Sequence, residues 1–189
     1  MKRIIVGISG ASGVIIGYRL LEALGAHPEV ERHLVVSDNA KLTWQQEAKL
    51  PLDALLSQAE VVHPQDNMAA AISSGSFITD GMIIAPCSMK TLAGLVSGYS
   101  DNLLLRAADV CLKENRKVVL VPREMPLGKL HLRNLSTAAD LGCVIIPPML
   151  SFYIEGDTVE AQLAHITGRI LMQFGLAHKP FHPWEGLNP

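Results

Sequence analysis

A glycine-rich turn near the start of the chain constrains the fold more than any other segment. The apolar run 3–6 leads into three glycines spaced three residues apart, Gly7, Gly10 and Gly13, and an apolar pattern at helical spacing begins at Val14. The chain therefore passes from a strand into a helix through a tight turn. Glycine lets backbone N–H groups approach an anion there, and the helix adds the positive end of its dipole. The turn predicts a phosphate site, and a tight turn that binds nothing is the alternative.

The spacing G-x-x-G-x-x-G differs from the dinucleotide fingerprint G-x-G-x-x-G. A nicotinamide dehydrogenase, with Asp38 as the acceptor for a ribose hydroxyl, is one alternative function. A recognisable Tyr/Lys or His pair for proton relay does not follow in the sequence, and the altered spacing disfavours this function.

Composition limits the partners of the chain. Its 189 residues and the lack of a low-complexity linker predict one domain, residues 1–189. A net charge of −2 argues against nucleic acid or a membrane surface as the main partner, so we expect a small ligand. An odd number of separated cysteines favours the reducing cytoplasm, and no run approaches the roughly 20 apolar residues of a membrane span. The cysteines and histidines lack metal-ligand spacing, so we expect no metal.

Strand and helix patterns alternate along the whole chain. This alternation predicts an α/β fold, a doubly wound parallel sheet of about six strands covered by helices on both faces. We expect strands at 3–6, 33–36, 61–62, 82–85, 117–121 and 143–146. We expect helices from Val14, Ser37, Pro51, Lys90, Asp101, Leu132 and Thr158.

Three details of these helices are specific expectations. Ser37 and Asp101 precede apolar helical patterns and are expected to cap them. The last helix, about 158–174, is expected to bury one face, which consists of Val159, Leu163, Ile166, Ile170 and Phe174.

Ligands of such sheets bind outside the carboxyl ends of the strands. That rule brings several separated segments to one rim of the molecule. They are Gly10–Gly13, Ser37, Cys87–Thr91, Arg123 and Tyr153.

Seven short motifs occur in a characteristic order. They are Gly7–Gly13, Ser73–Ser76, Pro86–Leu92, Arg106–Val110, Pro122–Glu124, Pro147–Pro148 and Phe152–Tyr153. In this order and spacing the chain resembles, over almost its whole length, the flavin prenyltransferases of the UbiX type, which were formerly described as aromatic-acid decarboxylases. The resemblance implies a three-layer, Rossmann-like flavoprotein fold with strand order 321456.

The resemblance also implies a chemistry. It is a metal-independent transfer of a dimethylallyl group from dimethylallyl phosphate to N5 and then C6 of reduced FMN. The product, prenylated FMN, serves a UbiD-type decarboxylase. Two alternatives stay open: a flavin-dependent decarboxylase that acts directly on an aromatic or cysteine-derived carboxylic acid, and a non-catalytic FMN carrier.

Site residues follow from the same resemblance. Those expected to bind FMN are Gly10, Ala11, Ser12, Ser37, Ser88, Met89, Lys90, Thr91 and Arg123. Those expected to bind dimethylallyl phosphate are Tyr153, Arg169, Lys113, Arg106 and Trp184. Those expected to take part in catalysis are Glu47, Lys113, Ser12, Arg106 and Glu124.

The chemical types of these residues suit the reaction. Cations stabilise a phosphate that leaves, and an apolar pocket shelters an allylic cation from water. Glu47 is expected to accept the proton lost when C6 is alkylated. Glu124 is expected to reach a neighbouring subunit, since the family assembles as a dodecamer with sites at subunit junctions. A tail of about 177–189 is expected to close over a site through Trp184.

Overall fold

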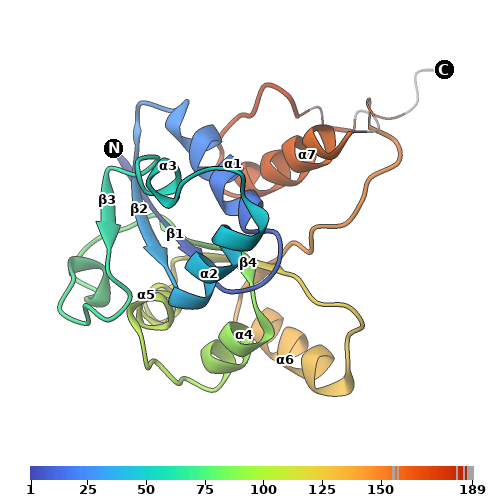
Figure 1. Cartoon of the computed structure of the whole chain (residues 1–189). Coiled ribbons are helices and arrows are strands. Elements are labelled where there is room, and N and C mark those ends of the chain that lie inside the picture. The colour runs from blue at the N-terminus through green and yellow to red at the C-terminus, as the bar shows by residue number, and fades with distance from the viewer. Residues whose placement is uncertain (155, 157, 182, 185, 187–189) are drawn as a thin grey trace.

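In the computed structural model, which describes residues 1–154, 156, 158–181, 183–184 and 186, one six-stranded sheet forms the centre of the molecule (Figure 1). Its order is β3-β2-β1-β4-β5-β6, and neighbouring strands pair in parallel. The expected α/β class and the order 321456 are therefore confirmed. The strands are β1 (Lys2–Ile8), β2 (Val30–Val36), β3 (Val61–His63), β4 (Gly81–Cys87), β5 (Lys117–Pro122) and β6 (Val144–Ile145).

Helices cover both faces of this sheet (Figure 1). One layer contains α1 (Val14–Gly25), α2 (Asp38–Glu47), α3 (Leu52–Leu56) and α7 (Val159–Met172). The other contains α4 (Met89–Val96), α5 (Leu103–Lys113) and α6 (Lys129–Asp140), with the short 3₁₀ helix η1 (Ala71–Ser73) against α5.

Strand β1 explains why the leading apolar run is continuous. Ile4, Val6 and Ile8 belong to the core under α1, α2 and α7, whereas Ile5 belongs to the core under α4 and α5. Successive side chains of a strand point to opposite faces, so a central strand buried on both faces has to be apolar at every position.

Three local expectations were wrong in detail. Asn102, not Asp101, caps α5: its Oδ1 accepts a hydrogen bond from the Leu105 backbone N–H at 3.0 Å, while the Asp101 carboxylate lies 3.6 Å from Lys90 Nζ. Strand β6 has only two residues, because just Val119 and Leu120 of β5 pair with it. Val159 is 68% exposed, because it lines a surface cavity at the first turn of α7 instead of packing in the core.

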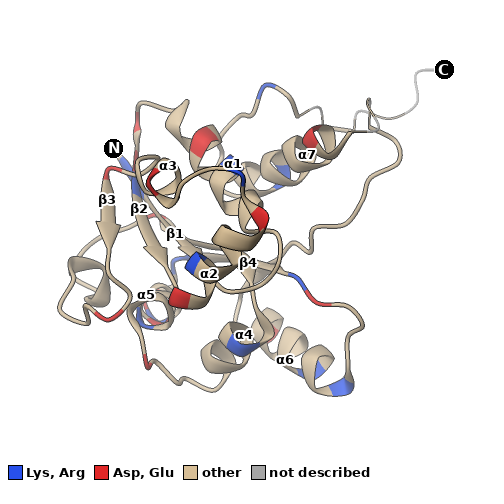
Figure 2. Ribbon diagram, viewed as in Figure 1, with Lys and Arg blue, Asp and Glu red and all other residues tan. Residues whose placement is uncertain are grey.

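Basic and acidic residues are spread over the helices of both layers (Figure 2). In this view neither the basic nor the acidic residues gather into one large patch, which agrees with a net charge of only −2. Across the residues that the structure describes, every helix is too short or too polar to cross a membrane.

An ion pair joins β2 to the residue before β3. The Arg32 guanidinium donates to both oxygens of Glu60, and the Arg32 backbone N–H donates to Glu60 Oε2 at 2.7 Å. These hydrogen bonds to Arg32 lower the pKa of Glu60 to about 2. Because protonation in the folded state requires a lower pH than in the unfolded state, the pair stabilises the fold above pH 4.5 and loses this effect as the pH falls toward 2.

Glu60→Gln is expected to lower the free energy of unfolding at pH 7 by up to about 1 kcal/mol, since the Glu60 side chain is 43% exposed and solvent screens the pair. The difference from the wild type should shrink as the pH is lowered from 4.5 toward 2. Urea unfolding across this range measures it, with Asp140→Asn at the exposed end of α6 as the control. A difference that stays constant at low pH would contradict the assignment.

Candidate functional site

The glycine turn after β1 and the loop after β4 lie against each other at the carboxyl edge of the sheet. Buried Ser9 joins them: its hydroxyl donates to the Pro86 carbonyl at 2.9 Å and accepts from the Ser88 backbone N–H at 2.7 Å. Helices α1, α2, α4 and α5 all begin at this edge, so the positive ends of four helix dipoles converge on it.

A polar cavity of about 600 Å³ lies on one side of the turn. Ser37 caps α2 there, accepting from the Ala40 N–H at 3.2 Å, and Ser88 caps α4, accepting from the Thr91 N–H at 3.3 Å. The cavity therefore combines hydroxyl groups with helix N-termini, the donor set that anions use. It is lined by Gly10, Ser37, Asp38, Asn39, Gln65, Asp66, Ser88, Lys90, Thr91, Asp101, Asn102 and Leu104.

Carboxylates balance the cation in this cavity. Lys90 lies 3.6 Å from Asp101, and Asp38 accepts hydrogen bonds from Lys41 and Gln65. The hydrogen bond from Lys41 is the largest effect that holds the pKa of Asp38 below its usual value. The cavity thus offers both donors for an anion and acceptors for hydroxyl groups.

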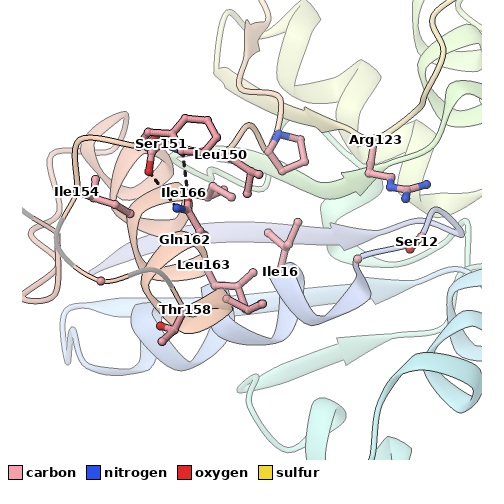
Figure 3. A pocket seen from close by; sticks show the side chains of 15 residues that line it. Ser12, Ile16, Arg123, Leu150, Ser151, Ile154, Thr158, Gln162, Leu163 and Ile166 are labelled. Atoms are coloured by element: carbon pink, nitrogen blue, oxygen red, sulfur yellow. Dashed lines mark hydrogen bonds between the residues drawn. The ribbon is translucent and has the colours of Figure 1, made fainter.

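A second cavity, of about 790 Å³, lies on the other side of the turn, between α1, α7 and the segment after β6 (Figure 3). Arg123 and Ser12 stand at one end and Ile154 at the other (Figure 3). Most of its wall is apolar, and it is lined by Ser12, Gly13, Ile16, Arg123, Pro148, Leu150, Ser151, Phe152, Ile154, Gly156, Thr158, Val159, Gln162, Leu163 and Ile166. We call it the apolar cavity.

Gln162 of α7 holds the wall of the apolar cavity in place. Its side-chain amide accepts from the Ser151 backbone N–H and donates to the Ser151 carbonyl, each at 2.9 Å (Figure 3). The two hydrogen bonds fix the segment that carries Leu150 and Phe152 against the helix.

Glu47, the last residue of α2, reaches the glycine turn. Its Oε2 accepts from the Gly13 backbone N–H at 2.8 Å. Gly13 has φ +93°, a left-handed conformation that glycine adopts without strain, and this conformation aims its N–H at the carboxylate. The structure therefore places Glu47, the residue expected to accept a proton, at the glycine turn beside Ser12.

Arg123 and Glu124 follow β5 and point in different directions. The Arg123 side chain lines the apolar cavity and has no ion-pair partner among the described residues, while its backbone N–H donates to the Cys87 carbonyl at 3.2 Å. The Glu124 carboxylate accepts from the Met125 backbone N–H at 2.9 Å and lines neither cavity.

Tyr153, Arg169 and Trp184 lie beside the apolar cavity and outside its lining. Tyr153 alternates with Phe152 and Ile154, which face the cavity. Its ring makes an edge contact with Trp184, with centroids 5.8 Å apart. Arg169 lies exposed on α7. The expected tail 177–189 extends partly outside the described residues, and what the structure describes of it includes this Trp184 contact and a contact of Phe181 with His165.

Arg106 and Lys113 of α5 are not brought to either cavity of their own chain. Arg106 donates to the Ser73 carbonyl at 3.0 Å and pairs with Asp109 at 2.8 Å, and Lys113 pairs with Glu114 at 2.7 Å. Helix α5 runs antiparallel to the strands, so about 13 Å of helix rise separates Leu104, at the polar cavity, from Lys113. Within one chain, the expected roles of these two residues at the donor phosphate therefore stay a prediction.

Two expected flavin contacts, Ala11 and Met89, do not line either cavity in this structure. The Ala11 backbone N–H already donates to the Ser9 carbonyl at 2.9 Å, and Ala11 is buried. Met89 is half-buried and packs against the core under α4 rather than lining a cavity. Lys90 and Thr91 of the same turn do line the polar cavity.

The cysteines are buried thiols, and their chemistry is suppressed. Burial raises the pKa of Cys87 to about 12, which removes the thiolate that a nucleophile needs. Cys87 therefore shapes the end of β4. Among the described residues, no group of three or more His, Cys, Asp or Glu side chains is arranged to hold a metal ion.

Sequence reasoning missed several residues of the site. Gln65 and Asp66 line the polar cavity from a long loop, and Asn39 packs against Gly10. Gln162 carries a polar side chain on the cavity side of an otherwise apolar helix face, which is a signal that the sequence does contain. His165 has no such signal.

Gly10→Ala is expected to lower the free energy of unfolding by about 1–3 kcal/mol. A Cβ atom at Gly10 would lie 2.5 Å from Asn39 Cβ and 3.0 Å from the Asn39 carbonyl carbon, so α2 has to move away from the turn. Urea unfolding measures the change. Gly128→Ala is the control, because the nearest atom to its Cβ lies at 3.9 Å; equal stabilities of the two variants would contradict the close approach.

Comparisons with known proteins agree with this geometry. The Flavoprotein family model matches residues 1–171. A probable UbiX-like flavin prenyltransferase from Sedimentibacter hydroxybenzoicus is 61% identical over 184 residues, covering 97% of each chain. A dodecameric FMN-dependent UbiX-like decarboxylase from Escherichia coli O157:H7 has a TM-score of 0.95 at 49% identity, covering 97% of this chain and 100% of that one. AnUbiX in complex with FMN and dimethylallyl pyrophosphate has a TM-score of 0.95 at 44% identity, covering 99% of each.

Proposed function

Because this chain belongs to the Flavoprotein family and, within it, to the UbiX-type flavin prenyltransferases, we propose that it joins a dimethylallyl group from dimethylallyl phosphate to N5 and C6 of reduced FMN. The observation that carries the proposal is a pair of cavities of opposite character, one polar and one apolar, that lie on the two sides of one glycine turn. A flavin that carries a phosphate and a prenyl donor that carries an apolar C5 group need this combination.

The residues present fit FMN. Ser37, Ser88 and Thr91 offer hydroxyl groups at two helix N-termini for the phosphate, and Lys90 adds a positive charge. Asp38 supplies carboxylate oxygens that accept hydrogen bonds from ribityl hydroxyls. Ser12 and Arg123, on the other side of the glycine turn, would hold the ring system. When bound, reduced FMN supplies the nucleophilic atoms N5 and C6.

The apolar cavity fits the C5 group of the donor. Leu150, Phe152 and Ile154 form an apolar wall, which would exclude water from the carbon atom at which the carbon–oxygen bond breaks once a neighbouring subunit covers Leu150 and Phe152. The phosphate that leaves carries negative charge, which Arg123 at the cavity end and Arg169 and Tyr153 beside it stabilise.

Glu47 has the position of the proton acceptor. Substitution at C6 releases one proton, and the Glu47 carboxylate is held next to Ser12 by its hydrogen bond from Gly13. Ser12 lines the apolar cavity, and the flavin and the C5 group are proposed to meet beside these two side chains.

Oligomerisation supplies the groups that one chain lacks. We propose a homododecamer in which Arg106, Lys113 and Glu124 complete the site of a neighbouring subunit; the Escherichia coli relative is described as dodecameric. Large exposed apolar side chains near the site support an interface there. They are Met125, Met149, Leu150 and Phe152, exposed by 82%, 70%, 64% and 90%.

The chain is also proposed to form one domain, with its tail closing over a site through the contact of Trp184 with Tyr153. We place it in the cytoplasm, which the three buried free thiols support. Its product is proposed to pass to a UbiD-type decarboxylase that uses prenylated FMN.

The test is an anaerobic incubation of the purified protein with FMN, a reductant and dimethylallyl phosphate. Mass spectrometry of the released flavin is expected to show the gain of one C5 prenyl unit, and dimethylallyl pyrophosphate is tested in parallel as the donor. An unchanged flavin together with release of carbon dioxide from a phenolic acid would overturn the proposal in favour of a direct decarboxylase. An unchanged flavin that remains bound without carbon dioxide release would instead support a carrier.

A further inference from the structure

An aromatic cluster connects three segments that are distant in the sequence. It consists of Tyr153 from the loop after β6, His165 from α7, and Phe181 and Trp184 from the C-terminal segment. The planes of the Tyr153 and His165 rings stand at 86°, and their centroids are 5.7 Å apart. The centroids of the His165 and Phe181 rings are 5.3 Å apart. The contacts join the loop and the C-terminal segment to the helix.

The two polar members of this cluster differ in burial. Tyr153 is 61% exposed, while His165 is only 9% exposed, so the imidazole supports the phenol from the protein side. Tyr153 Oη lies 3.4 Å from His165 Nε2, within hydrogen-bond reach. Of the groups described, this hydroxyl is the only hydrogen-bond partner of the His165 ring.

The backbone leaves His165 little room to move. A Cβ atom at Gly168 would overlap the Phe181 ring, which shows that Phe181 packs directly on α7 beside His165. The imidazole is thus held between Phe181 and Tyr153, and its direction is fixed by packing.

Burial, and after it the nearby Arg169 guanidinium, lower the pKa of His165. The imidazole is therefore neutral at pH 7, with one nitrogen as donor and one as acceptor. When Nε2 carries the proton, it donates to Tyr153 Oη. The proton of the phenol is then left for another acceptor, and the first hydrogen bond strengthens the second.

We propose that His165 is a positioning residue for Tyr153, which directs the phenol O–H toward the phosphate of the prenyl donor. Arg169 lies one helical turn after His165 on α7 and faces the same phosphate under the proposed function, on which this inference depends. His165 itself touches no substrate in this arrangement and acts through Tyr153.

The test measures binding of dimethylallyl phosphate to protein loaded with oxidised FMN, in which no turnover occurs. His165→Phe keeps a ring of similar size but loses the nitrogen, and we expect it to weaken the Kd about five- to tenfold, the effect of one neutral hydrogen bond. His165→Gln keeps a side-chain N–H and is expected to restore most of the affinity. In turnover, KM for the donor should rise more than kcat falls.

The decisive comparison is a double-mutant cycle with Tyr153→Phe. We expect His165→Phe to have no further effect once the Tyr153 hydroxyl is absent. The control on the same helix is Thr167→Val, because the buried Thr167 hydroxyl has no hydrogen-bond partner among the described residues and its loss should leave the Kd unchanged.

A full effect of His165→Phe in the Tyr153→Phe protein would overturn the inference, as would an unchanged Kd in the single variant. Wild-type protein that binds the donor but leaves FMN unmodified in the anaerobic assay with a reductant would overturn the proposed function alone, since the double-mutant cycle needs only binding. Wild-type protein that does not bind the donor would overturn both.

Discussion

Glu47→Gln is expected to slow prenyl transfer by about 10²–10⁴-fold, the usual contribution of a positioned proton acceptor. The carboxylate of Glu47 accepts a hydrogen bond from the Gly13 N–H at 2.8 Å. The amide oxygen of glutamine accepts the same hydrogen bond, so the turn keeps its conformation while the group that takes the proton is lost. The measurement is single-turnover formation of prenylated FMN from reduced FMN and dimethylallyl phosphate.

Two results separate this role from a structural one. FMN affinity and thermal unfolding of Glu47→Gln should match the wild type, because the polar cavity that is proposed to hold the phosphate is unchanged. Glu22→Gln on α1 is the matched control, since Glu22 pairs with Arg19 outside the polar and apolar cavities. A Glu47→Gln protein with the wild-type rate of prenyl transfer would show that another group takes the proton.

Much of the fold followed from local patterns in the sequence. The run at 82–85 predicts a buried strand because it is apolar at every position, and Ser37 predicts a cap because it is a serine directly before a helical pattern. The structure confirms the cap, since the Ser37 hydroxyl accepts a hydrogen bond from the Ala40 N–H. The error at Asp101 has the same origin. Asp101 and Asn102 are both good capping residues, and only the backbone conformation of the structure decides between adjacent candidates.

The sequence predicted the part of the site that the strand topology determines. Parallel strands bring Gly10, Ser37 and Ser88 to one edge, whatever their distance in the sequence. The contact of Glu47 with Gly13 depends on where α2 ends, and that of His165 with Tyr153 depends on the path of a long loop. Neither path is encoded in a local pattern, so these contacts required the structure.

Lys113 shows the limit of reasoning from one chain. The resemblance to the family assigns it to the donor phosphate, yet α5 carries it away from the cavities of its own chain. The proposed homododecamer would resolve this disagreement, because Lys113 would then act in the site of a neighbouring subunit. It also explains why Lys113 lies exposed at the end of α5, next to the Ser73–Ser76 loop that Arg106 and Arg116 hold by their hydrogen bonds to backbone carbonyls.

Lys113→Ala is expected to lower kcat/KM by about 10²–10³-fold, comparable to the loss of one group that stabilises developing charge. Its fold should persist, because the pair with Glu114 is exposed and contributes little to stability. Arg123→Ala is expected to be similarly inactive. Suppose that Lys113 and Arg123 serve one site from different subunits. Oligomers assembled from an equal mixture of the two variants should then regain activity at about one quarter of their sites. These are the sites that receive an intact Lys113 from one subunit and an intact Arg123 from the other.

The mixed-oligomer experiment uses differently tagged variants that are co-expressed and purified through both tags. Its control is a mixture of Arg123→Ala with Glu47→Gln, whose residues meet at the glycine turn of the same chain. Every site in that mixture keeps one defect, so activity should stay at the level of the single variants. No recovery in the Lys113 and Arg123 mixture would show that Lys113 does not act across a subunit junction, because a site built within one chain cannot be repaired by its neighbour. Recovery in the control would instead show that Arg123 and Glu47 do not serve a site from the same chain.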